Sequence, residues 1–189
     1  MIVFGFRDTL ESMRTAYIGM GGNVASWAGS PEATLAAAAR RLESLGRVTR
    51  RSSLYSTAPV GFTAQPRFVN AVVELETVLG PRELLDGLLA IEKEFGRDRT
   101  AGFKNGPRTL DLDILLLGEL EISEAGVEIP HPRLAERAFV LVPLCEMAAG
   151  VIVPGCGETV QRVFARLREG ALADVDAMER IESAAWPSR

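Results

Sequence analysis

The sequence predicts an α+β fold: a ferredoxin-like (split βαβ) antiparallel sheet with helices packed on it, plus an extra hairpin. Two observations support this prediction. Segments with the periods of strands and helices follow one another in the order strand, helix, strand, strand, helix, strand. The chain has 189 residues, of which 47% are hydrophobic and 24% charged, and this is enough apolar material for one domain with its own core.

The first strand and the first helix are predicted within residues 15–46. Residues 15–20 form a short strand, and the glycines of the Gly21–Asn23 segment predict a tight turn after it. Ser30 is a typical helix cap, and Pro31 suits the first helical position. Apolar residues follow at helical spacing until Gly46 ends the helix: Leu35, Ala38, Leu42 and Leu45.

Two strands and a second helix come next. Residues 47–56 alternate as a strand, and a loop over 57–66 connects them to a strand over 67–78. Pro81 is predicted to begin the second helix and Gly96 to end it. On the 67–78 strand, alternate positions form an apolar face that we expect to be buried: Val69, Ala71, Val73 and Leu75.

The remaining elements surround one further strand. A polar loop over 97–107 leads into a strand over 109–117, and a turn at Gly118 and a hairpin are expected after it. A rigid turn at Pro130–Pro132, a short helix and an apolar segment over 138–147 follow. With this strand, the predicted order of the split βαβ sheet is complete.

Composition and charge exclude several classes of function. The net charge is −4 and the pI about 5.2, so no overall basic field attracts the protein to nucleic acid. Cys145 and Cys156 are the only cysteines, and their spacing fits neither a zinc site nor a disulfide framework. Two reduced thiols suit the cytoplasm. No apolar run reaches the length of a membrane span, and Met1–Met13 lacks the apolar core of a signal peptide.

Two aspartates in the 109–117 strand are the strongest functional signal. Asp111 and Asp113 are two residues apart, so their side chains lie on the same face of the strand, roughly 7 Å apart. They repel each other unless a cation lies between them, and Mg²⁺ is the cation that such a pair suits. An edge strand with two solvated aspartates is the alternative. Nearby cations favour a metal–triphosphate site: Arg97, Arg99, Lys104 and Arg108.

A second group of residues could bind a flat heterocycle. Phe68 and Asn70 share one strand face, where the ring of one can stack on a heterocycle and the carboxamide of the other can bond its edge. The preceding loop, from Thr57 to Gln65, could offer backbone groups to the same ring. The alternative is a solvated strand face.

Four further residues have open assignments. Glu92 lies on the packed stripe of the second helix or is a surface acid of its last turn. His131, the only histidine, lies between two prolines and is either structural or a ligand contact. Arg137 and Phe139 could supply a cation and a ring to a site, although the pattern by itself favours a surface arginine and a core phenylalanine.

Several segments in order resemble the 6-hydroxymethyl-7,8-dihydropterin pyrophosphokinase family of folate biosynthesis. The resemblance covers roughly residues 15–150, and its ordered set of motifs is more specific than any single one. The matching segments are Tyr17–Asn23, Ser53–Gly61, Gln65–Ala71, Gly96–Arg99, Pro107–Leu115, Pro130–Pro132 and Arg137–Leu144. The resemblance implies an enzyme that transfers the β,γ-diphosphate of ATP, its co-substrate, to the hydroxymethyl group of the pterin and releases AMP.

The resemblance also implies roles for individual residues. Asp111 and Asp113 would hold two Mg²⁺ ions, and with Arg97 and Arg108 they would form the catalytic group. The residues expected at the pterin are Thr57, Val60, Phe68, Asn70, Phe103 and Phe139. Phe103 stands near the position where family members often carry a tryptophan. The residues expected at ATP are Glu92, Arg97, Arg99, Arg108, Ile114, His131 and Arg137.

The resemblance completes the expected organisation. Residues 1–14 are an N-terminal extension, residues 15–170 the pyrophosphokinase domain, and residues 171–189 a peripheral helix and tail. ATP and the pterin are the expected partners, with neither nucleic acid nor a membrane among them, and a monomer is one option that the sequence leaves open. Two rivals remain: a nucleotidyltransferase that would release pyrophosphate, and a binding module without turnover.

Overall fold

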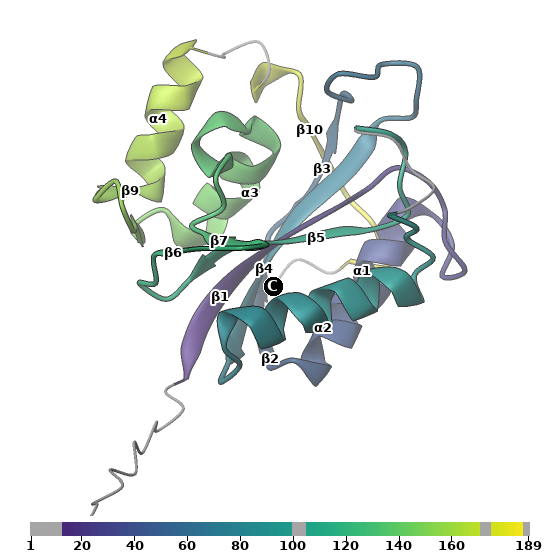
Figure 1. Cartoon of the computed structure of the whole chain (residues 1–189). Helices are drawn as coiled ribbons and strands as arrows, with labels where there is room; N and C mark the ends of the chain where they lie inside the picture. Colours follow the sequence, from purple (N-terminus) through teal and green to yellow (C-terminus); the bar gives the residue numbers. More distant parts are fainter. Residues whose placement is uncertain (1–12, 100–104, 171–174, 187–189) are drawn as a thin grey trace, which may run out of the picture.

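The computed structural model describes residues 13–99, 105–170 and 175–186. Within these residues the chain forms a mixed α/β fold in which one antiparallel sheet has helices on both faces (Figure 1). The strand order is β10-β3-β4-β1-β5, and β2 pairs with another part of β4. The strands of this sheet are β1 (Arg14–Gly22), β2 (Arg47–Arg51), β3 (Leu54–Thr57), β4 (Phe68–Thr77), β5 (Asp111–Leu117) and β10 (Glu179–Ile181).

One face of the sheet packs on two helices, α1 (Pro31–Arg41) and α2 (Pro81–Glu94), with the 3₁₀ turn η1 (Leu42–Ser44) after α1. The alternation predicted for the 67–78 segment is confirmed, because its four apolar residues all lie in this core. Ser30 caps α1 by accepting a hydrogen bond from the Ala33 N–H, and Pro31 begins the helix, as predicted. The core therefore forms where the apolar period of the strands meets that of the helices.

The opposite face packs on α3 (Ala138–Ala148), and α4 (Val160–Gly170) packs against α3 (Figure 1). The apolar segment over 138–147 is thus a helix, and Leu141 and Leu144 are fully buried against Val72 and Leu115. The 3₁₀ turn η2 (Leu134–Glu136) precedes α3, and the short strands β8 (Ile152–Val153) and β9 (Glu158–Thr159) connect α3 to α4. The helices leave one end of this sheet face uncovered, and the candidate site lies there.

The strand predicted over 47–56 is interrupted, which corrects the prediction. The Val72 N–H donates to the Ser52 hydroxyl, not to a backbone carbonyl, at 2.9 Å. The Ser53 N–H and hydroxyl both donate to the carboxylate of Glu146 on α3, at 3.0 and 2.7 Å. The Ser52 N–H still donates to the Val72 carbonyl at 2.9 Å, but these side chains take the place of the other ladder partners, so β2 and β3 are separate strands on the same edge of β4.

The glycine-rich segment after residue 20 also differs from the prediction. Gly21 and Gly22 continue β1 and do not form a turn. A Cβ at Gly22 would lie 2.4 Å from the Thr109 carbonyl oxygen, so only glycine allows this close approach of two backbones. β1 pairs with β4 on one side and β5 on the other, and Gly21 is opposite both Asn70 and Asp111.

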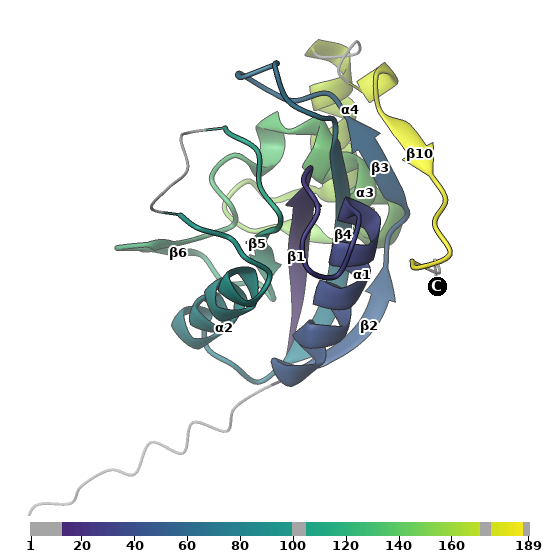
Figure 2. The same cartoon turned by 90° about the vertical axis from the view of Figure 1, so that its right-hand side faces the viewer.

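The predicted extra hairpin is present as β6 (Ile122–Glu124) and β7 (Val127–Ile129). The segment after residue 170 was expected to be a peripheral helix and tail, but its described part includes a strand of the main sheet, because β10 pairs with the exposed edge of β3 (Figure 2). Within the described residues, no helix has both the length and the apolar character to cross a membrane.

Candidate active site

Asp111 and Asp113 project from β5 toward the side of the sheet that faces α3. Their neighbours Leu110, Leu112 and Ile114 point into the core on the opposite side, as the alternation predicted. Both carboxylates line a cavity of about 540 Å³. The aspartates therefore belong to a concave site, and the alternative of two solvated edge residues is not supported.

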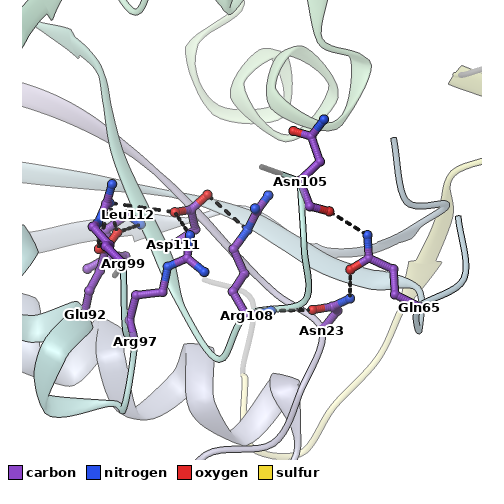
Figure 3. A network of polar contacts seen from close by, with 9 residues as sticks. All are labelled: Asn23, Gln65, Glu92, Arg97, Arg99, Asn105, Arg108, Asp111 and Leu112. Atoms are coloured by element: carbon purple, nitrogen blue, oxygen red, sulfur yellow. Dashed lines mark hydrogen bonds and ion pairs between the residues drawn. The ribbon is translucent and has the colours of Figure 1, made fainter. Parts of the chain in front are cut away.

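Three arginines surround Asp111 (Figure 3). Its Oδ1 lies 3.8 Å from Arg97 and 3.9 Å from Arg99, and its Oδ2 lies 3.2 Å from the Nε of Arg108. The Nε of Arg97 is buried and has no hydrogen-bond partner among the described residues, and the buried Nε of Arg108 has the ion-pair contact with Asp111 but no hydrogen bond. Buried donors of this kind are costly unless they find an acceptor, so the cluster suits an anion with several oxygens, such as a polyphosphate.

The donor set also fits Mg²⁺. Burial, and then the charge of Asp111, raise the pKa of Asp113, while Arg137, Arg99 and Arg108 lower it. A divalent cation between the two carboxylates would remove this repulsion. The described residues contain no cluster of three or more acidic, histidine or cysteine side chains that could enclose a metal. Two carboxylates with room for water and phosphate oxygens are what Mg²⁺ uses beside a nucleotide.

Two glycines of β1 separate Asn70 from the carboxylates and form the floor of the cavity, which we call the glycine floor. Gly19 and Gly21 of β1 lie opposite Asp113 and Asp111, on the same face of the sheet. A Cβ at Gly21 would lie 2.8 Å from the Oδ1 of Asn70. Adjacent strands are about 4.8 Å apart, so Asn70 and Asp111 are about 10 Å apart across this open floor. A planar ligand can reach from one to the other without meeting a side chain of β1.

The end of the larger cavity beside Asn70 can hold a planar ring. The Nδ2 of Asn70 donates to the hydroxyl of Thr57 at 2.8 Å, which orients the carboxamide. Phe68 from β4 and Phe139 from the start of α3 also line the cavity. Each ring has a guanidinium above it, Arg108 at 4.9 Å from Phe68 and Arg137 at 5.6 Å from Phe139. This end combines aromatic faces with an oriented carboxamide, as the sequence predicted.

A second cavity, of about 290 Å³, adjoins the first. Its walls include Leu85 of α2, Ile114 of β5 and Ile129 of β7. Asp113 and His131 line both cavities, so the two spaces meet beside the carboxylate pair. Burial, with the charge of Arg137, lowers the pKa of His131 to about 4. The Arg133 N–H donates to its Nδ1 at 3.0 Å, which requires that nitrogen to be unprotonated.

Glu92 takes a different position from the one expected of a ligand contact. Its side chain is buried, which confirms the packed-stripe assignment. It lines neither cavity. Its Oε1 accepts from the Leu112 N–H at 2.8 Å and from Arg99, and its Oε2 also accepts from Arg99. Burial raises the pKa of Glu92, and these hydrogen bonds lower it. Glu92 therefore joins α2 to the strand of the aspartates and to one of their arginines.

Other site residues were missed or cannot be placed. Asn23 donates to Gln65, and its Oδ1 accepts from the Arg108 N–H at 2.9 Å (Figure 3). Gln65 in turn donates to the Asn105 carbonyl at 2.8 Å, so three loops meet around the cavity. The motifs contained these residues, but no local pattern indicated their long-range partners. Val60 lines the cavity and is largely exposed. Phe103 lies outside the described residues.

The antiparallel sheet carries a carboxylate pair surrounded by arginines, at the point where two cavities meet. This combination is typical of an enzyme that transfers phosphate groups. The family model of 7,8-dihydro-6-hydroxymethylpterin-pyrophosphokinase matches residues 17–149. This chain therefore belongs to that pyrophosphokinase family.

Relatives and solved structures agree with this membership. A 2-amino-4-hydroxy-6-hydroxymethyldihydropteridine pyrophosphokinase of Methylorubrum extorquens is 39% identical over 172 residues, covering 90% of this chain and all of the relative. A pyrophosphokinase of the same name from Pseudomonas aeruginosa is 43% identical, covering 75% of this chain and 85% of the relative.

Some relatives are much longer. A mitochondrial folate synthesis bifunctional protein of Arabidopsis thaliana is 52% identical over 56% of this chain, which spans only 19% of that protein. The wild-type HPPK-DHPS crystal structure of Plasmodium falciparum has the same fold, with a TM-score of 0.68 and 14% identity. The match covers 91% of this chain and 49% of that one.

Proposed function

We propose that this protein transfers the β,γ-diphosphate of ATP to the hydroxymethyl oxygen of 6-hydroxymethyl-7,8-dihydropterin, giving the pterin diphosphate and AMP. Family membership supports the reaction. The single structural observation that carries it is the meeting of two cavities at Asp113. One cavity has the aromatic and carboxamide groups that suit a pterin, and the other combines apolar side chains with Glu124 and Glu128, a lining that suits a nucleotide base.

The pterin is proposed to lie between Phe68 and Phe139, with its polar edge at Asn70. The oriented carboxamide can pair with a ring that presents both donors and acceptors. Backbone groups around Thr57 and Val60 border the same space. This placement points the hydroxymethyl group across the glycine floor toward the carboxylates.

ATP is proposed to place its base against Ile114 and its phosphates along the arginine cluster. His131 borders both spaces and is neutral at physiological pH, so it can bond a nucleotide oxygen without repelling the arginines. Arg97 and Arg108 would give their buried Nε donors to phosphate oxygens. Glu92 would act on ATP only through Arg99, which it orients.

The chemistry is an in-line displacement at the β-phosphorus. The hydroxymethyl oxygen forms the new bond and releases its proton to solvent, and the bridging oxygen between the α- and β-phosphorus leaves with AMP. Two Mg²⁺ ions held by Asp111 and Asp113 would supply charge neutralisation at the phosphates. The arginines stabilise the charge on the transferred group, and the two cavities hold the reacting atoms in line. Positioning and electrostatics are sufficient for this class of reaction.

A product assay tests the proposal. The protein is incubated with ATP, Mg²⁺ and 6-hydroxymethyl-7,8-dihydropterin, and AMP, ADP and pyrophosphate are separated. The expected result is AMP that depends on the pterin, without free pyrophosphate. Release of pyrophosphate would favour the nucleotidyltransferase, and binding of both ligands without turnover would favour the binding module.

Two finer assignments accompany the proposal. The strand order β3-β4-β1-β5 with α1 and α2 on one face supports a ferredoxin-like core for the sheet. The free thiols of Cys145 and Cys156 support a reducing compartment such as the cytoplasm. ATP and the pterin are the proposed partners.

A further inference from the structure

The chain after residue 149 lies outside the family match, yet part of it returns to the site. We call residues 175–186 the C-terminal strap. Within it, β10 pairs antiparallel with β3, with Glu179 opposite Ser56 and Ile181 opposite Leu54 (Figure 2). Without β10, the backbone of β3 would be an open edge of the sheet. The strap therefore stabilises the strand that ends at Thr57.

The strap is anchored in the core at its far end. Trp186 is only 4% exposed, and its indole N–H donates to the Ser52 carbonyl at 2.8 Å. The guanidinium of Arg51 lies 5.4 Å from the centre of the same ring. Ile181, the last residue of β10, packs against the main core on the side of this anchor. A buried indole with its donor satisfied is a strong anchor for a short segment.

A second attachment lies beside the site. Arg67 precedes Phe68, and its Nη2 donates to the carbonyls of Ser56 and Ala177, each at 3.0 Å. Its Nε donates to the Ser56 hydroxyl at 2.8 Å. One guanidinium thus links the strap to β3 and to the beginning of β4. These are the two strands that carry Thr57 and Asn70.

The strap also reaches the ligand cavity itself. Ala177 and Met178 line the larger cavity together with Thr57 and Asn70. Continuing the β10–β3 register by one position places Met178 opposite Thr57, whose hydroxyl accepts the hydrogen bond from Asn70. Met178 is partly buried. A flexible thioether side chain in this position can adapt to the edge and face of a planar ring.

We propose that the C-terminal strap is part of the pterin site, in which Met178 supplies an apolar contact to the bound ring and the strap fixes the strand that orients Asn70. This inference rests on the proposed function. It assigns a ligand-determining role to a segment beyond the matched family region.

The test compares Met178→Ala with two controls. Met178→Leu retains an apolar side chain of similar size, and Glu182→Ala changes an exposed residue of the same strap. Dissociation constants are measured by titration with 6-hydroxymethyl-7,8-dihydropterin, in the presence of Mg²⁺ and a non-hydrolysable ATP analogue. The affinity for the ATP analogue is titrated separately, and thermal unfolding is followed for each variant.

Met178→Ala is expected to weaken pterin binding about tenfold, because it removes apolar contact area from the ligand. Its affinity for the ATP analogue and its melting temperature should stay close to those of the wild type, and both controls should bind the pterin within about twofold of it. Unchanged pterin affinity in Met178→Ala, or an equal loss for both ligands, would overturn the role of the strap. If the wild type itself binds no pterin, the proposed function fails, and the inference fails with it.

Discussion

Glu92 offers the sharpest test of how the site is supported. Although the residue was expected at ATP, its carboxylate is buried and directed at the Leu112 N–H and at Arg99. Leu112 lies between the two aspartates of β5, so loss of this acceptor leaves an unpaired donor inside the strand that carries both carboxylates. We predict that Glu92→Ala destabilises the fold and displaces the aspartates, although Glu92 touches neither cavity.

The magnitude follows from the contacts. The unpaired Leu112 N–H costs about 1–3 kcal/mol. Removal of buried side-chain carbon beyond Cβ adds about 0.8 kcal/mol. The Arg99 ion pair adds at most about 1 kcal/mol, because that side chain is 51% exposed and solvent screens the pair. The expected loss of unfolding free energy for Glu92→Ala is therefore about 2–5 kcal/mol.

Glu92→Gln is the matched control. Its carboxamide oxygen can still accept from Leu112, so the unfolding free energy should stay within about 1 kcal/mol of the wild type. The unfolding free energy of both variants is measured by urea denaturation, in which the m value should not change, and the Kd for an ATP analogue is measured separately. If Glu92→Ala keeps full stability and only ATP binding is weakened, Glu92 is a direct ligand contact and the reasoning is wrong.

Three other predictions concern the site directly. Asp113→Ala should lower pterin-dependent AMP formation at least about 100-fold with an unchanged melting temperature, and activity near that of the wild type would refute the metal assignment. Asn70→Ala should weaken pterin binding about 10- to 100-fold in titrations and leave ATP binding unchanged, because only one substrate meets the carboxamide. For His131, the unfolded chain is protonated below its usual pKa of 6.5 while the native residue stays neutral down to about pH 4. Stability should therefore fall by about 1 kcal/mol from pH 6.5 to pH 5, after allowing for partial exposure, and the dependence should be weaker in His131→Asn.

Strand faces were predictable because alternation is a local property. Phe68 and Asn70 were assigned to one face of their strand and Val69 and Ala71 to the other, and the structure confirms both assignments. The same argument correctly placed the carboxylates of β5 on the face opposite their leucine neighbours. The polar residues of the site were identified in this way before their partners were known.

Partners across the chain could not be predicted by the same reasoning. The glycines after Met20 were assigned to a turn, because local propensity cannot show that β5 and its preceding loop approach their backbone closely. The break between β2 and β3 depends on the hydrogen bond from Val72 to Ser52 and on that from Ser53 to Glu146, whose partners are distant in sequence. The strand β10 exists because β3 offers a free edge, and a three-residue strand has too weak a pattern of its own.

The sequence by itself determined the order of the elements, the faces of the strands and the carboxylate–arginine motif, since each depends on residues within a few positions of one another. Tertiary structure alone decided that Glu92 faces inward, that two cavities meet at Asp113, and that the strap reaches the end of the larger cavity beside Asn70. These features arise from packing between segments that are distant along the chain. Which residues meet is decided by burial and by the need of buried polar groups for hydrogen-bond partners, and the local periodicity of the sequence gives no information about this choice.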